Sequence, residues 1–177
     1  MKDESLIVLD FLSRGHATSR RGEPLAQGIG KKFMNLLEVV VKEGVTVKPG
    51  EELYIGDKER NEVKYIKGRI KYESLTGFAK SELEHVIESL IKDSEDRFVN
   101  FFNVAGPIST RLHSLELLQG VGKKHMWAII KERKNKKFES FEDLKKRVEM
   151  LPDPKKMVKK RVIEELKETD RYRLFVV

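Results

Sequence analysis

Hydrophobic residues in the N-terminal part of the chain occur in short runs that polar turns separate. The runs that favour a strand cover residues 6–12, 25–29, 33–41, 51–55 and 62–70. The turn Lys48-Pro49-Gly50 has a physical basis, because proline fixes one φ angle and glycine permits a positive one. Several short strands at this spacing predict a small barrel or sandwich. The length of the segment fits an oligonucleotide/oligosaccharide-binding (OB) type of barrel, which has five strands.

The hydrophobic spacing changes to that of a helix after residue 75. Apolar residues recur there every three or four positions, at Leu83, Val86, Ile87, Leu90, Ile91, Phe98, Phe101 and Phe102. Thr76 and Ser81 are candidate N-caps, and Gly106-Pro107 ends the pattern. We therefore expect one long helix within residues 76–106, packed on the barrel.

Residues 107–177 form helical patterns that turns interrupt. The glycines of Gly120-Val121-Gly122 break the first pattern, Ser140 caps a short helix, and Asp153-Pro154 combines an N-cap with proline at the first helical position. The last residues, 171–177, look extended. The predicted fold class is α+β, with an OB-like β-barrel at 1–75, the linking helix at 76–106 and an all-α helix-hairpin-helix domain at 107–177.

The positive charge of the chain is concentrated in this last segment. Residues 1–106 contain 17 Lys/Arg and 18 Asp/Glu, a net of −1, whereas residues 107–177 contain 19 and 11, a net of +8. Such segregation is typical of a domain that binds a polyanion. A solvated, lysine-rich helical surface is the alternative explanation.

Composition excludes several other classes of protein. The chain has no cysteine, which rules out disulfides, iron–sulfur clusters and thiol nucleophiles. Its apolar runs are too short to cross a membrane, and its start is acidic, unlike a signal peptide. His16, His85, His113 and His125 have no metal-ligand spacing. We expect a soluble cytoplasmic protein that is not an enzyme and has no cofactor.

The segment 115–130 resembles the helix-hairpin-helix pattern of DNA- and RNA-binding proteins. Gly120 and Gly122 permit a tight turn and a close approach of phosphate, while Val121 anchors the turn in the helix junction. The amides that open the next helix, together with Lys123 and Lys124, then form a phosphate site. In proteins of this pattern the turn carbonyls often also hold a monovalent cation.

The match is imperfect, and a second hairpin is degenerate. Gln119 replaces the usual proline, and Met126 replaces the usual alanine. The second hairpin falls at residues 151–155 and has lost both glycines. Asp153 puts a carboxylate where phosphate should lie, and Pro154 removes an amide donor. We infer one hairpin that binds phosphate and one that is only structural.

Two further features have open interpretations. Arg14, Arg20 and Arg21 form a second basic cluster, which is either a solvated loop or a second nucleic-acid contact. Trp127 lies beside the hairpin, where we expect it to be packed; stacking on a base is the alternative.

The overall arrangement resembles an uncharacterised archaeal (DUF655-like) family of predicted nucleic-acid-binding proteins, in which an OB-type barrel is joined to a helix-hairpin-helix tail. The resemblance rests on residues 23–27, 48–51, 54–56, 79–83 and 110–124. It implies an RNA or DNA partner contacted through the phosphate backbone, in ribosome assembly or translation, with ribosomal RNA or assembly factors as partners. It leaves the choice between RNA and DNA and the oligomeric state open.

Two alternatives remain at the level of the sequence. A protein-binding adaptor would use the barrel or the long helix and have little affinity for polyanions. A helix-hairpin-helix DNA glycosylase would use Asp143, which follows Gly122 at a suitable distance. However, Ser140 and the acidic first turn after it give Asp143 a structural role, and the chain has no large helical domain to surround a flipped base.

Overall fold

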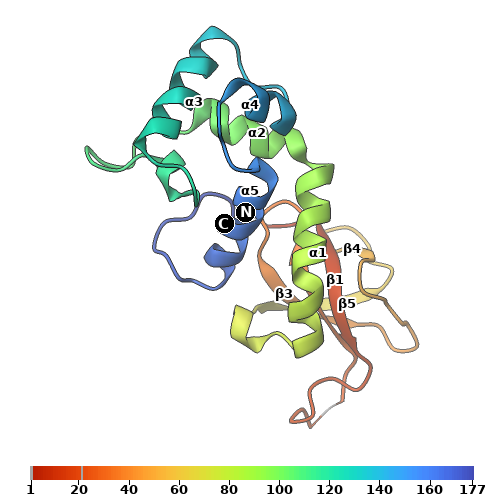
Figure 1. Cartoon of the computed structure of the whole chain (residues 1–177). Helices are drawn as coiled ribbons and strands as arrows, with labels where there is room; N and C mark the ends of the chain where they lie inside the picture. Colours follow the sequence, from red (N-terminus) through yellow and green to blue (C-terminus); the bar gives the residue numbers. More distant parts are fainter. Residues whose placement is uncertain (1, 21) are drawn as a thin grey trace. The chain divides into compact units, whose positions relative to one another are not determined.

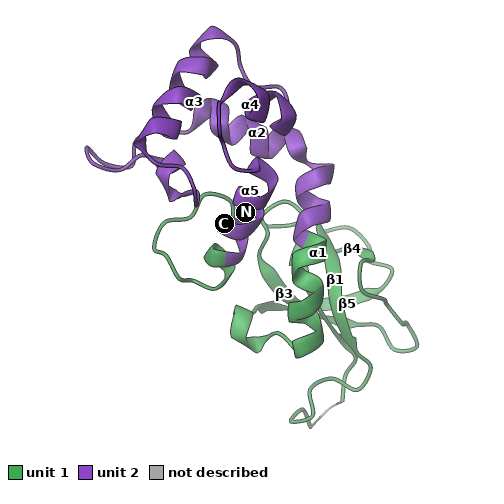
Figure 2. Cartoon of the chain, in the orientation of Figure 1, with its two compact units in different colours: residues 1–86, 164–177 green, residues 87–163 purple. Residues whose placement is uncertain are grey.

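The computed structural model describes residues 2–20 and 22–177 of the chain. The chain divides into two compact units, which Figure 2 shows in different colours. The sheet unit comprises residues 1–86 and 164–177, and the helical unit comprises residues 87–163.

The sheet unit contains five antiparallel strands (Figure 1). They are β1 (Ser5–Leu12), β2 (Leu25–Gly30), β3 (Leu36–Val41), β4 (Glu52–Tyr54) and β5 (Val63–Arg69). Every strand lies within or beside a run that the hydrophobic pattern predicted. The core between them is aliphatic, and its fully buried side chains include Leu6, Val8, Val39 and Val63.

The predicted OB-like barrel is wrong, because the sheet is open. Its strand order is β4-β1-β2-β3-β5, so β4 and β5 are its two edges and the sheet forms a half-barrel. β4 has only three residues, and the segment between β4 and β5 is polar and irregular. Closing a barrel needs long, staggered strands with continuous pairing, which this edge does not supply.

The predicted long helix is also interrupted. α1 (Gly77–Asp93) and α2 (Glu95–Val104) are separated at Ser94, whose φ of −124° and ψ of 37° are not helical. The polar residues around this position favour caps and turns over helix interiors, which explains the break. Thr76 is a cap, as expected, because its hydroxyl oxygen accepts a hydrogen bond from the Ala79 amide at 3.0 Å. Ser81 instead donates to the Phe78 carbonyl within the helix.

The C-terminal segment does not form the predicted all-α helix-hairpin-helix domain. The Gly120–Gly122 turn follows a single 3-10 turn, η2 (Ser114–Leu117), where that domain needs an α-helix. The turn leads into α3 (Lys123–Asn135), followed by α4 (Phe141–Arg147) and α5 (Pro154–Leu166). Residues 164–177 belong to the sheet unit, so residues 107–177 are not a separate domain.

The chain end is held by one buried carboxylate and forms no strand. Glu165 is 1% exposed, and it accepts hydrogen bonds from the amides of Leu174, Phe175 and Val176 at 2.7, 3.0 and 2.9 Å. The Val177 amide then donates to the Phe33 carbonyl at 3.1 Å. The tail, which looked extended from the sequence, therefore returns to the sheet unit as an irregular segment without strand pairing.

Replacing Glu165 with alanine should destabilise the protein by about 2–4 kcal/mol, because buried amides lose their acceptor. Glu164→Ala is the matched control, since it removes the same charge from the same helix without removing a side-chain acceptor. Urea unfolding of both variants measures the difference in free energy. Equal losses would show that Glu165 does not hold the tail.

Candidate nucleic-acid interface

The positive excess of the protein lies in the helical unit. Residues 87–163 contain 18 Lys/Arg and 11 Asp/Glu, a net of +7, whereas the sheet unit contains 18 of each and is neutral. A polyanion is therefore attracted to the helical unit more than to the sheet unit.

The turn before α3 requires glycine at position 120. Gly120 has a φ of 90°, which L side chains rarely adopt, and a Cβ there would lie 2.9 Å from Pro152 Cγ. Val121 is 6% exposed, and its amide donates to the Leu118 carbonyl at 3.1 Å. The turn is thus fixed by backbone conformation and by a buried anchor, as the sequence predicted for Val121.

A capping box supports the same turn from η2. His113 Nδ1 accepts from the Leu115 amide at 3.1 Å, and Glu116 Oε2 accepts from the His113 amide at 2.9 Å. Lys123 Nζ donates to the same Glu116 oxygen at 2.9 Å. Hydrogen bonds from Lys123 and from the His113 amide hold the pKa of Glu116 below its ordinary value. Lys123 therefore already has an anionic partner.

The first turn of α3 is open to solvent. Gly122 is the N-cap of this helix, and no side chain caps the helix there. A Cβ added at Gly122 would point into open space, with no atom within 4 Å. The first backbone bond of the helix is from the Met126 amide to the Gly122 carbonyl at 2.9 Å, so the amides of residues 123–125 precede it. Lys124 is exposed and has no ion pair within residues 2–20 and 22–177. Free amides, the helix dipole and Lys124 together suit an anion.

The carbonyl of Gly120 already has a partner. His125 Nδ1 lies 3.1 Å from this oxygen, within hydrogen-bond distance. A monovalent cation at the turn, which the resemblance to helix-hairpin-helix proteins suggests, would compete with that histidine for the carbonyl. The cation stays a prediction.

The outer face of α3 adds Lys131 and Lys134, which sequence reasoning missed, to Lys124 and Trp127, which it named. Trp127 is 63% exposed, so the expectation that it is packed is wrong. Lys124, Trp127, Lys131 and Lys134 are all exposed and are spaced by three, four and three residues, which places them on one face of the helix. We call these four residues the α3 face. The spacing was present in the sequence, but only the burial of Met126 and Ile129 decides which side of α3 faces solvent.

The family of the chain follows from comparison with known proteins. A family model described as "Protein of unknown function (DUF655)" matches residues 2–177. The chain belongs to this family. It is 45% identical over 171 residues to uncharacterized protein MJ0038 of Methanocaldococcus jannaschii, covering 96% of this chain and 77% of that protein. It is similar to the crystal structure of Af1531 from Archaeoglobus fulgidus, with a TM-score of 0.88, 46% identity and coverage of 99% of this chain and 100% of that one. The resemblance to an uncharacterised archaeal DUF655 family is confirmed, whereas nucleic-acid binding stays a prediction.

The predicted arginine cluster of this DUF655 protein lies in its sheet unit. Arg14 and Arg20 are exposed in the loop between β1 and β2, whereas Arg21 lies outside the described residues. His16 attaches this loop to the sheet, because its Nε2 lies 2.5 Å from Oε1 of the buried Glu38. The arginines therefore belong to a different unit from Gly120–Lys124.

Asp143 of the DUF655 protein is engaged in holding α4. Its carboxylate accepts from the Glu139 amide and from Arg147, both at 3.1 Å, while Ser140 Oγ caps the helix by accepting from the Asp143 amide at 2.9 Å. Burial raises the pKa of Asp143, but the hydrogen bonds from Glu139 and Arg147 together lower it below its ordinary value. These contacts give Asp143 a structural role at a helix start.

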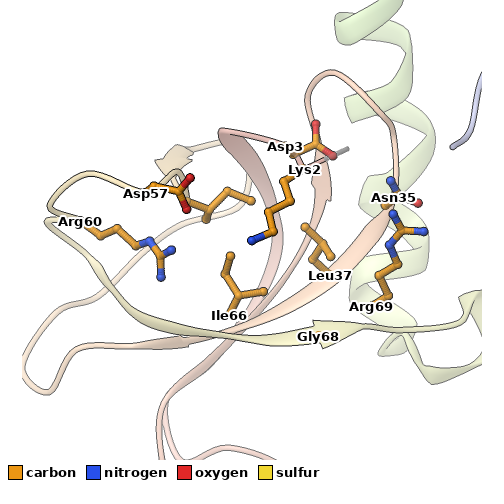
Figure 3. A pocket seen from close by; sticks show the side chains of 10 residues that line it. Lys2, Asp3, Asn35, Leu37, Asp57, Arg60, Ile66, Gly68 and Arg69 are labelled. Atoms are coloured by element: carbon orange, nitrogen blue, oxygen red, sulfur yellow. The ribbon is translucent and has the colours of Figure 1, made fainter.

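The sheet unit of the DUF655 protein contains a pocket of about 300 Å³ (Figure 3). Its lining combines apolar and charged side chains, among them Leu37, Ile55, Ile66, Lys2, Arg60, Arg69, Asp3 and Asp57. Three cations face two carboxylates, so the charges nearly balance.

Within the described residues no group of three or more His, Asp or Glu could hold a metal ion, and no helix is long and apolar enough to span a membrane.

The capping box should make stability depend on pH. Burial, and then the nearby Arg133, lower the pKa of His113 below its ordinary value of 6.5. The unfolded chain therefore takes up this proton first, and the stabilisation is complete above pH 6.5 and is lost as the pH falls below it. His113→Asn keeps a capping acceptor without titrating. Thermal unfolding between about pH 7.5 and 5.5 should show a smaller loss in this variant than in wild type.

The exposed His85 supplies the control for this measurement. His85→Asn also removes one histidine, but from the surface of α1, and should leave the pH dependence of stability unchanged. If His113→Asn follows the wild-type curve, the buried histidine is not responsible.

Proposed function

We propose that this protein is a non-enzymatic nucleic-acid-binding protein that contacts the phosphate backbone through the start of α3. The observation that supports this most strongly is the coincidence of charge and geometry in one place. The helical unit has a net charge of +7, and α3 offers open amides beside an unpaired lysine. Such amides bind phosphate oxygens without reading base identity.

The site residues divide into those that shape the turn and those that contact the ligand. Gly120 and Val121 fix the conformation of the turn, and Gly122, which has no side chain, leaves the amides at the start of α3 accessible to solvent. Lys124 is available to a phosphate. Lys123 is paired with Glu116, so it would have to break that ion pair before it could contact a phosphate. We therefore assign the main charged contact to Lys124.

The partner is RNA or DNA, and ribosomal RNA fits the expected role in ribosome assembly or translation. Contacts to phosphate serve both kinds of nucleic acid. Arg14 and Arg20 would supply a second contact from the sheet unit. An adaptor role, in which the exposed surfaces bind a protein, predicts little affinity for polyanions. Measuring the binding of RNA and DNA at several salt concentrations distinguishes the two roles.

Replacing Lys124 and Lys131 with glutamine should weaken binding to nucleic acid about tenfold or more at low salt. Each lysine that contacts a phosphate releases counterions, so the slope of log K against log salt should fall by about one for each lysine removed. The control is Lys48→Gln with Lys58→Gln, which removes the same charge from exposed positions of the sheet unit. Fluorescence anisotropy with labelled RNA and DNA at several salt concentrations measures both quantities.

Two results would contradict this assignment. One is affinity that does not change with salt in the wild type, since phosphate contacts require such a dependence. The other is an equal loss in the two double variants, which would replace the α3 site with a diffuse attraction to charge.

Introducing Gly122→Asp should change stability and binding in opposite directions. An aspartate at this N-cap accepts from the free amides and complements the helix dipole, so it should stabilise the protein by about 0.5–1 kcal/mol. The same carboxylate occupies the amides that a phosphate needs, so affinity for nucleic acid should fall. Gln119→Glu makes the same charge change at an exposed position before the turn, without capping α3.

Thermal unfolding and binding are measured on both variants. If Gln119→Glu weakens binding as much as Gly122→Asp, the effect is one of net charge, and the amides at the start of α3 are not the phosphate site.

A further inference from the structure

We propose that Trp127 is a stacking platform for an unpaired base of single-stranded nucleic acid, with lysines of the α3 face holding the adjacent phosphates. This inference rests on the proposed function for its electrostatic part. It adds the class of ligand: a strand whose bases are free to leave a helix.

The exposure of Trp127 is not required by the packing of α3. The inward side of the helix is filled by Met126 and Ile129, which are 4% and 0% exposed. The indole is 63% exposed, although burying an aromatic side chain of this size removes a large apolar area from water. A ligand that covers the exposed indole ring would therefore gain free energy by removing this apolar area from water.

The surroundings of the indole favour an anionic occupant. Lys124, Lys131 and Lys134 share its face, and no carboxylate forms an ion pair with them within residues 2–20 and 22–177. The one acidic residue of α3, Glu132, is paired with Arg147, whose Nε lies 3.5 Å from Glu132 Oε2. A protein partner would need acidic groups here in addition to an apolar patch, whereas a nucleic acid supplies phosphates and aromatic rings together.

The geometry favours a single strand over a duplex. Lys124 and Lys134 are ten residues apart, which is about 15 Å along a helix and spans several nucleotides. In a duplex each base is stacked between neighbouring bases, so no base face is available to stack on the indole of Trp127. In a single strand a base can stack on the indole while its neighbouring phosphates meet the lysines, a mode that tolerates any sequence.

The test uses the fact that Trp127 is the one tryptophan in the chain. The full-length protein is titrated with a single-stranded oligonucleotide, with a duplex of the same length, and with inorganic polyphosphate, which has charge but no bases. The single strand should strongly quench or shift the tryptophan fluorescence. Duplex and polyphosphate should bind at low salt with little change in the emission of Trp127.

Trp127→Ala should weaken single-strand binding roughly ten- to hundredfold, as expected for the loss of one stacked base, and should leave polyphosphate affinity within about twofold. Trp127→Phe should recover part of the loss, because a smaller ring still stacks. Phe78→Ala is the control, since it removes an aromatic residue that is 51% exposed in the sheet unit, and should have no effect.

The outcomes separate this inference from the proposed function. If Trp127→Ala lowers single-strand and polyphosphate affinity alike, or lowers neither, stacking is overturned while salt-dependent phosphate binding stands. If no single-stranded oligonucleotide changes the emission of Trp127, stacking is likewise overturned. If neither oligonucleotide nor polyphosphate binds at low salt, both proposals fail.

Discussion

The close approach of Gly120 and Pro152 determines how the helical unit presents its surface. Any Cβ at position 120 would lie 2.9 Å from Pro152 Cγ, and the φ of 90° is itself unfavourable for other residues. This contact joins the turn before α3 to the segment before α5, and the buried Val121 secures it from within. Because the turn has one conformation, α3 leaves it in one orientation, with Met126 inward. The outward position of Trp127 is a consequence of that orientation.

Two arginines of the helical unit, Arg133 and Arg147, bind backbone carbonyls, whereas the lysines of the α3 face are exposed to solvent. Arg133 donates to the carbonyls of Phe102 and Ala105 at the end of α2, at 3.1 and 2.8 Å. Arg147 does the same for the carbonyls of Glu132 and Lys136 at the end of α3, at 2.8 and 2.6 Å. The guanidinium groups thus bind carbonyls at the helix ends, where most carbonyls have no partner within the helix; the Glu132 carbonyl also accepts from the Lys136 amide at 3.2 Å. Lys124, Lys131 and Lys134 are instead exposed to solvent, and an ammonium group is a point charge suited to phosphates more than to the edges of bases.

Local signals in the sequence predicted the elements of this protein better than their assembly. The strands, the caps at Thr76 and Ser140 and the buried Val121 follow from alternation, capping chemistry and spacing, which act over a few residues. Closure of a barrel depends on whether β4 and β5 meet, and that is decided by tertiary pairing. The break at Ser94 was hidden because apolar spacing continues through it. The exposure of Trp127 could not be predicted either, since an aromatic residue beside buried Met126 has two available faces and only packing selects one.

The helical unit contains two helix starts with the same lysine pair but different access to the backbone. Lys123-Lys124 opens α3, and Lys155-Lys156 follows Pro154 at the start of α5. At α5 the carboxylate of Asp153 accepts from the Lys155 amide at 3.0 Å, and proline has no amide to offer. At α3 the N-cap is a glycine with no side chain, so the amides stay free. A ligand attracted by charge alone meets two similar positions, whereas a phosphate that needs amide donors is accommodated at α3 and opposed by a carboxylate at α5.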